Sequence, residues 1–171
     1  GEGGGFKNPR DVSTMVLLPL VRSQVDVPII AAGGFIDGAT MAAAFALGAE
    51  AVQMGTRMVS SLESPGHDNW KNSIVDAAEP DTVFLNRAHS PALRALRTEK
   101  TSRLEFETET NAMTEFGAAL DLYFGGDMEA SIALTGQVCG RIDTVRPVAE
   151  IIAEVRHEFF QVIGELSEQY H

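Results

Sequence analysis

The sequence predicts an α/β fold in which parallel strands are covered by helices. Two short apolar runs, at residues 28–32 and 51–54, each stop at a glycine, and an alanine-rich stretch of helical character lies between them. Strands that are apolar on both faces are typical of a parallel sheet buried beneath helices. Strand, glycine turn, helix and second strand within about thirty residues make a βαβ unit.

The elements around this unit follow from glycine, proline and capping residues. Residues 1–11 hold four glycines and a proline, which predicts a loop. A short helix should start near Pro19, because proline is tolerated in a first turn, and should end by Val25. Asp37 can cap the helix between the two strands, and Gly48 can end it.

The second half of the chain has a less regular pattern. Residues 69–78 predict a helix and residues 82–85 a short extended piece. Residues 98–110 are polar without a clear period, so they form either a linking helix or a loop. Residues 125–127 indicate a turn before a helix that begins near Met128.

The last helix has the clearest helical period. Its apolar residues recur at helical spacing from Val148 to Leu166, as expected of a core-facing stripe. Thr144 can cap this helix, and Pro147 is tolerated in its first turn.

Composition excludes several classes of function. The 13 Lys and Arg residues face 24 Asp and Glu residues, a net charge of −11, so we expect neither nucleic acid nor an anionic membrane as a partner. No apolar run reaches the length of a membrane span.

Cys139 is the single cysteine, which fits a cytoplasmic location. It could be a nucleophile, but we favour the interpretation that it is a small buried residue. No histidine pair has metal-ligand spacing, and we expect no metal.

The glycines that end the two apolar strands indicate a phosphate site. A phosphate needs several converging donors, and glycine lets backbone N–H groups approach it closely. Gly33-Gly34 provides one such turn, ahead of a helix whose dipole adds positive charge, and Gly55-Thr56 provides a second turn with a hydroxyl. Glycines also simply end strands, but two such turns on consecutive parallel strands favour a phosphate site.

A resemblance to a known family rests on these residues. The stretches at residues 28–38, PIIAAGGFIDG, and 47–57, LGAEAVQMGTR, resemble the nitronate monooxygenase (2-nitropropane dioxygenase) family. That family is related to flavin-dependent enoyl-acyl carrier protein reductases and NAD(P)H:quinone reductases. The resemblance is specific over residues 1–100 and weaker at residues 126–130 and 135–137.

The resemblance implies a TIM (β/α)8 barrel that binds FMN. This chain would supply the C-terminal strands and helices of the barrel together with a small, mostly helical extra region. It would comprise a half barrel at residues 1–97, a helical insertion or small extra domain at 98–144, and a helix at 145–171 that packs back on the barrel. The FMN-binding residues implied by the resemblance are Gly4, Gly5, Ala32, Gly33, Gly34, Gly55 and Thr56.

One residue departs from the family pattern. Members usually carry a histidine after the two glycines, as the acid–base residue beside the flavin, and here Phe6 occupies that position. A phenyl ring cannot transfer a proton, so the catalytic residue is unknown. Lys7 could stand in, although an exposed loop lysine is the favoured interpretation. His67 could lie near the mouth of the site, but a surface histidine is again favoured.

These observations leave three hypotheses. The first is an FMN-dependent oxidoreductase, above all a nitronate monooxygenase that uses oxygen, or alternatively an NAD(P)H-dependent reductase of quinones or enoyl thioesters. The second is a phosphate-sugar barrel enzyme, and the third a catalytically impaired FMN-binding protein. Under each hypothesis the protein acts on or binds a small molecule. Because an isolated half barrel leaves strand edges unpaired, we expect the N-terminal half of the barrel as a partner, and a homodimer stays open.

Overall fold

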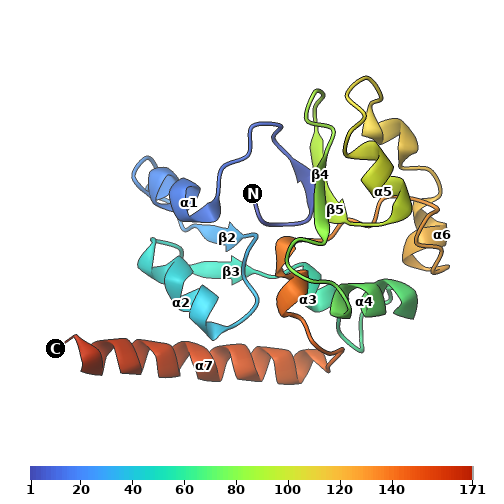
Figure 1. Cartoon of the computed structure of the whole chain (residues 1–171). Helices are drawn as coiled ribbons and strands as arrows, with labels where there is room; N and C mark the ends of the chain where they lie inside the picture. The colour runs from blue at the N-terminus through green and yellow to red at the C-terminus, as the bar shows by residue number, and fades with distance from the viewer. Residues whose placement is uncertain (171) are drawn as a thin grey trace.

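The computed structural model describes residues 1–170 (Figure 1). Its strands form a parallel two-stranded sheet and a separate antiparallel sheet of three strands. The strands are β1 (Gly5–Lys7), β2 (Ile30–Ala32), β3 (Ala51–Gln53), β4 (Thr82–Leu85) and β5 (Ala92–Leu96). The α-helices are α1 (Thr14–Arg22), α2 (Gly38–Ala46), α3 (Thr56–Val59), α4 (Asp68–Val75), α5 (Glu99–Leu104), α6 (Ala119–Tyr123) and α7 (Val148–Gln169). Two 3₁₀ helices complete the set, η1 (Ala112–Glu115) and η2 (Gln137–Arg141). None of the helices within residues 1–170 combines the length and apolarity that crossing a membrane requires.

The predicted βαβ unit is confirmed by a parallel pair of strands. β2 and β3 pair from Ile30 opposite Ala51 to Ala32 opposite Gln53, and α2 connects them. Because both strands run in the same direction, their carboxyl ends and the glycine turns that follow lie at one edge of the sheet. This edge forms part of the candidate site.

The limits of α2 follow from the predicted caps. The Asp37 carboxylate accepts a hydrogen bond of 2.8 Å from the Thr40 amide. The Thr40 hydroxyl in turn accepts one of 3.2 Å from the Asp37 amide, and the two bonds form a capping box. At the other end, Gly48 takes a φ of +100°, a left-handed conformation that glycine adopts without steric cost. Both predicted boundary residues are therefore confirmed.

The C-terminal helix α7 packs along α2 (Figure 1). The rings of Phe45 and Phe159 meet edge to face with centroids 5.1 Å apart. A Cβ at Gly38 would collide with the backbone of Phe159, so glycine permits this close approach. Helix α7 begins at Val148 with Pro147 in the cap position, and the prediction that Thr144 caps it is wrong.

A second, antiparallel sheet has the strand order β1-β5-β4. The extended piece at residues 82–85 was predicted, whereas β5 was not, and β1 lies within the stretch predicted to be loop. Strand β1 pairs with β5 from Gly5 opposite Arg94 to Lys7 opposite Ala92. This pairing joins segments more than eighty residues apart, so no local pattern could indicate it.

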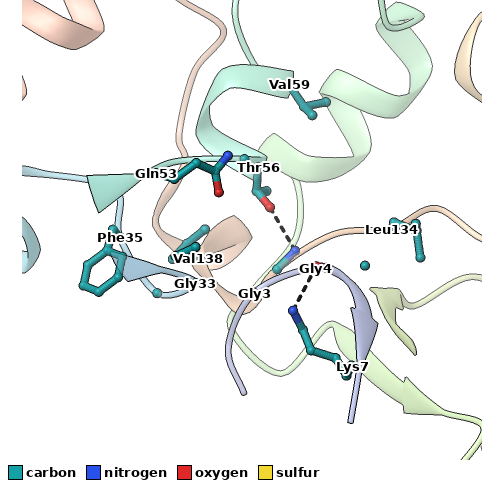
Figure 2. Close-up of a pocket in the computed structure, with 15 residues that line it drawn as sticks. Gly3, Gly4, Lys7, Gly33, Phe35, Gln53, Thr56, Val59, Leu134 and Val138 are labelled. Carbon is teal, nitrogen blue, oxygen red and sulfur yellow. Dashed lines mark hydrogen bonds between the residues drawn. The ribbon is translucent and has the colours of Figure 1, made fainter. Parts of the chain in front are cut away.

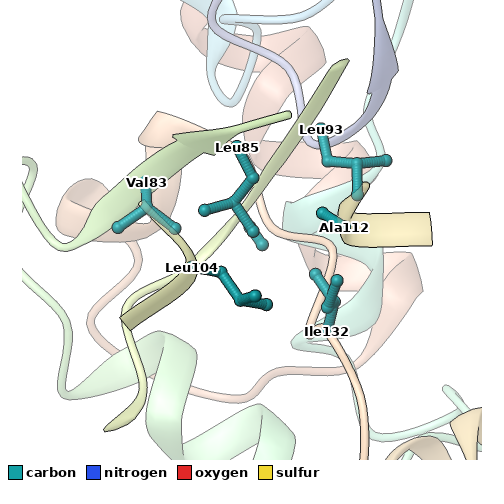
Figure 3. Packing of buried hydrophobic residues seen from close by; sticks show 7 residues of the cluster. Val83, Leu85, Leu93, Leu104, Ala112 and Ile132 are labelled. Atoms are coloured by element: carbon teal, nitrogen blue, oxygen red, sulfur yellow. The ribbon is translucent and has the colours of Figure 1, made fainter. Parts of the chain in front are cut away.

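Beneath the antiparallel sheet lies a compact apolar cluster (Figure 3). Its fully or nearly fully buried members are Val83, Leu85, Leu93, Ala95, Leu104, Ala112 and Ile132. Leu104 comes from α5, which Thr98 caps, so the first part of residues 98–110 forms a helix. The division of the chain at residues 97/98 and 144/145 stays a prediction.

Two other predicted helix boundaries are wrong. Helix α1 begins at Thr14, so Pro19 lies inside it rather than in its first turn. The carbonyl that loses its donor belongs to the exposed Met15, where water can satisfy it. No α-helix of the described residues begins near Met128: the Asp127 carboxylate accepts from the Glu129 amide and closes a turn instead.

Candidate functional site

A cavity of about 250 Å³ opens where β2 and β3 end (Figure 2). We call it the glycine cavity. It contains all seven residues that the sequence singled out, namely Gly4, Gly5, Ala32, Gly33, Gly34, Gly55 and Thr56. It is also lined by Gly3, Lys7, Phe35, Gln53, Val59, Leu134, Gly136 and Val138. The structure therefore brings the two glycine turns and the N-terminal glycines to one place.

The glycines are needed where three backbone segments meet. Gly33 and Gly34 take φ values of +95° and +90°, which side-chain-bearing residues rarely adopt. A Cβ at Gly33 would lie 3.0 Å from the Gly3 amide nitrogen. A Cβ at Gly4 would lie 2.7 Å from the carbonyl carbon of Thr135. Side chains at these positions would push the walls of the cavity apart.

Hydrogen-bond donors without protein acceptors line this cavity. Among residues 1–170, the amides of Gly34 and Gly55 donate to no protein acceptor. The buried Thr56 hydroxyl accepts a hydrogen bond of 2.9 Å from the Gly136 amide (Figure 2), which leaves its own hydrogen available. Thr56 also begins the short helix α3. These two amides and one hydroxyl carry no charge, so they suit an anion that is bound through directional hydrogen bonds.

Helix α2 does not line this cavity, and two amides of its first turn already have carboxylate acceptors. The Gly38 amide donates to Glu158 at 2.8 Å, and the Thr40 amide donates to Asp37. Two carboxylates thus already occupy the positive end of this helix. The turn itself, rather than the helix that follows, provides donors at Gly33-Gly34.

The N-terminal loop is held against the cavity by Glu2. Its carboxylate accepts hydrogen bonds from the Thr14 hydroxyl at 2.7 Å and the Thr14 amide at 3.1 Å, at the start of α1. Its carbonyl accepts from the Gln137 amide at 2.9 Å. Burial alone would raise the pKa of the Glu2 carboxyl, but the hydrogen bonds from Thr14 outweigh it, and the pKa lies below its usual value.

The strand β1 turns Phe6 and Lys7 in opposite directions. Phe6 is 56% exposed, stacks on Phe116 with ring centroids 6.0 Å apart, and does not line the cavity. Lys7 is half-buried in the cavity wall, where its Nζ donates to the Gly4 carbonyl at 3.1 Å (Figure 2). The interpretation of Lys7 as an exposed loop residue is therefore wrong. Side-chain alternation along a strand explains why neighbours differ in this way.

Burial and a neighbouring cation act on the Lys7 ammonium. Burial lowers its pKa, and the Arg94 guanidinium lowers it further, while Glu2 acts in the opposite direction. The net direction is downward from the usual value of a lysine. Lys7 thus gives up its proton more readily than an exposed lysine does.

Sequence reasoning missed the wall formed by Gly136. This residue lies eighty positions beyond Thr56, and a Cβ there would lie 3.0 Å from the Gly4 amide nitrogen. The weak resemblance at residues 135–137 was the one signal that pointed to it. Gln53 was missed as well, although its place at the end of β3 puts it beside the Gly55 turn.

Three other residues lie away from the cavity. Arg57 is buried and donates to the carbonyls of Ser60 at 2.6 Å and Thr144 at 2.7 Å, so it does not face a phosphate at the Gly55 turn. His67 caps α4 by accepting from the Asn69 amide at 3.0 Å. Cys139 is buried, and burial raises the pKa of its thiol. The prediction that Cys139 is a small buried residue is therefore confirmed.

Residues 1–170 contain no cluster of three His, Cys, Asp or Glu side chains that could hold a metal ion.

Similarity to known proteins covers nearly the whole chain. The family model described as nitronate monooxygenase matches residues 1–158. A "(3aS,4S,5R,7aS)-5-hydroxy-7a-methyl-1-oxo-octahydro-1H-indene-4-carboxyl-CoA dehydrogenase" from Rhodococcus jostii is 42% identical over 61% of this chain and 29% of its own length. A probable nitronate monooxygenase from Staphylococcus aureus is 30% identical over 95% of this chain and 48% of its own length.

The structure of FabK from Thermotoga maritima is also similar. It superposes with a TM-score of 0.91 at 40% identity, over 98% of this chain and 55% of that one. FabK is a TIM-barrel enzyme, so the predicted fold class is confirmed, and this chain corresponds to about half of that barrel. The chain spans about half or less of the length of the curated relatives it matches. Since the family model covers most of its residues, the chain belongs to the nitronate monooxygenase family.

Proposed function

We propose that this chain forms the phosphate-binding half of an FMN-dependent oxidoreductase. The observation that carries the proposal is the convergence of both glycine turns on one cavity, where the amides of Gly34 and Gly55 donate to no acceptor among residues 1–170. When bound, FMN would supply the capacity to accept and return a pair of electrons with a proton. The N-terminal half of the barrel would complete the site, and a cytoplasmic location would keep Cys139 reduced.

The residues present fit the phosphate end of the cofactor. The amides of Gly34 and Gly55 and the hydroxyl of Thr56 would hold the phosphate oxygens, while Gly33 keeps the approach clear of side chains. The glycine cavity, at about 250 Å³, is smaller than the roughly 300–1,000 Å³ typical of sites that enclose a drug-sized ligand. The rest of the cofactor would therefore lie against the other half of the barrel.

Two activities fit this site. The first is oxidation of a nitronate with oxygen, as the family name implies. The second is an oxidoreduction of an acyl-CoA substrate, supported by the 42% identity to a carboxyl-CoA dehydrogenase over 61% of this chain. Phe6 in place of the histidine also favours a reaction that does not need that base.

Flavin absorption tests the proposal. The native protein that contains this chain should be purified and its absorption spectrum recorded, and a flavin band is expected. Under anaerobic conditions it should then be mixed separately with a nitronate, a hydroxyacyl-CoA, NADH or NADPH. The compound that bleaches the band identifies the electron donor. A preparation that neither contains nor takes up FMN contradicts the proposal.

A glycine variant tests whether this cavity holds the cofactor. Gly33→Ala would force a Cβ to 3.0 Å from the Gly3 nitrogen at a φ of +95°, so FMN affinity should fall by at least roughly tenfold. The matched control is Gly164→Ala in α7, where a Cβ would meet nothing within 4 Å. FMN titration monitored by fluorescence quenching measures both variants. Equal affinities for the two would show that FMN binds elsewhere.

A further inference from the structure

The second glycine turn of the glycine cavity is followed by a very short helix. Thr56 lines the cavity and begins α3, which contains only four residues. A single helical turn is unstable by itself, because its nucleation costs more free energy than its few hydrogen bonds return. The positions of the Gly55 amide and the Thr56 hydroxyl therefore depend on contacts from outside α3.

These contacts come from residues that lie about eighty positions further along the chain. At the start of α3, the Gly136 amide donates to the Thr56 hydroxyl at 2.9 Å (Figure 2). At its end, the Arg57 guanidinium donates to the Thr144 carbonyl at 2.7 Å. Both ends of α3 are thus tied to the segment that leads into α7.

Arg57 makes its link through a single nitrogen atom. The same Nη2 that reaches Thr144 also donates to the Ser60 carbonyl at 2.6 Å, where it satisfies an acceptor at the C-terminal end of α3. The residue is only 6% exposed, and within residues 1–170 its guanidinium forms no ion pair. Its hydrogen bonds therefore join two backbone segments.

Stability alone does not explain an arginine at this position. Burial lowers the pKa of the Arg57 guanidinium and Arg146 lowers it further, while Asp143 and Glu154 act in the opposite direction. The buried Nε of Arg57 has no hydrogen-bond partner among the described residues. An apolar side chain of similar length would avoid both costs. What the guanidinium adds is geometry, because one planar group holds two carbonyls in a fixed relation.

We propose that Arg57 is a positioning residue for the cofactor phosphate: by tying α3 to Thr144, it fixes the donors of the second glycine turn. These donors are the Gly55 amide and the Thr56 hydroxyl. Arg57 itself does not line the glycine cavity. The inference rests on the proposed function of that cavity. Loss of Arg57 should reduce the part of the cofactor affinity that depends on the phosphate and spare the part that depends on the flavin ring.

Riboflavin, which is FMN without its phosphate, separates the two parts. The dissociation constants of FMN and riboflavin should be measured by equilibrium dialysis on the native protein after removal of its flavin. The ratio of the riboflavin Kd to the FMN Kd then reports the contribution of the phosphate. Arg57→Met should lower this ratio by about tenfold, the loss of roughly one hydrogen bond to a charged group, and leave the riboflavin Kd unchanged.

Arg57→Lys gives a second, milder variant in case Arg57→Met does not fold. Lysine keeps the charge but lacks the planar group that holds both carbonyls, so the ratio should fall by about threefold.

Leu104→Ala is the matched control for lost stability. Leu104 is 3% exposed in the cluster beneath the antiparallel sheet and does not line the glycine cavity. Its truncation should lower the urea midpoint at least as much as Arg57→Lys does and leave the Kd ratio of the parent protein unchanged. An unchanged ratio in the Arg57 variants, or an equal fall in Leu104→Ala, overturns the inference alone. A parent protein that binds FMN no more tightly than riboflavin refutes the proposed phosphate site, and the inference with it.

Discussion

At the scale of single residues, Glu2 links the N-terminal loop to three parts of the molecule. Its side chain caps α1 at Thr14, and its carbonyl fixes Gln137. The Thr14 hydroxyl also lies 3.1 Å from the Gly33 carbonyl, at the first glycine turn. One acidic residue therefore sets where Gly3 and Gly4 lie relative to the cavity.

Removing this carboxylate should weaken cofactor binding. In Glu2→Ala the Thr14 amide and hydroxyl lose a charged acceptor, and the loop is free to move away from Gly33. We expect the Kd for FMN to rise roughly tenfold, the cost of about one charged hydrogen bond. The control is Glu50→Ala, an exposed glutamate between α2 and β3. FMN titration that finds the same Kd for both variants would show that Glu2 does not order the site.

The contrast between Phe6 and Lys7 shows what sequence could predict at this scale. The motif indicated the position at which family members usually carry a histidine and showed that Phe6 stands there. It could not show which neighbour faces the cavity, because that depends on β1 pairing with β5 across more than eighty residues. Once the strand is present, its alternation turns Lys7 inward.

At the scale of elements, α2 depends on its N-terminal cap. Asp37 binds the Thr40 amide and also pairs with Arg141 of η2. Burial alone would raise its pKa, but the hydrogen bonds from Thr40 and the charge of Arg141 outweigh it, and the pKa lies below its usual 3.8. The stability that Asp37 contributes is therefore present above pH 3.8 and is lost as pH falls through the lower folded-state pKa.

Asp37→Ala should destabilise the fold by about 1–2 kcal/mol at pH 7, most of it the loss of the helix cap. Asp26→Ala, an exposed aspartate ahead of β2, is the control and should change stability by less than about 0.5 kcal/mol. Urea unfolding at pH 7 and near pH 3 measures both. A deficit for Asp37→Ala that stays the same at both pH values would contradict the assigned charge effect.

Elements with local signals could be predicted, and elements defined by distant contacts could not. The capped helix α2, the two parallel strands and the stripe of α7 all follow from residues close in sequence. Strand β5 was missed because its five residues, ALRAL, include a buried arginine and carry no alternation. Its burial depends on the cluster under the antiparallel sheet, whose members come from segments spread over fifty residues.

At the scale of the whole molecule, one side of the βαβ unit lacks cover. Among the described residues, α1, the segment after it and the start of β2 expose large apolar side chains, among them Met15, Val16, Leu20, Val27 and Ile30. Ile30 is 67% exposed although it lies in a strand of the parallel pair. Parallel strands normally have both faces covered, so we expect the other half of the barrel to pack here.

An acidic substitution at this surface tests the expected contact. In the native protein, Ile30→Asp would place a charge in the interface between the two halves and should lower the free energy of unfolding by about 3 kcal/mol or more. Ile30→Val keeps an apolar contact and should cost less than about 1.5 kcal/mol. Urea unfolding followed by flavin release measures both effects, since in the proposed function the two halves share the cofactor. If Ile30→Asp is as stable as Ile30→Val, this face stays open to water in the complete protein, and the second half of the barrel must join elsewhere.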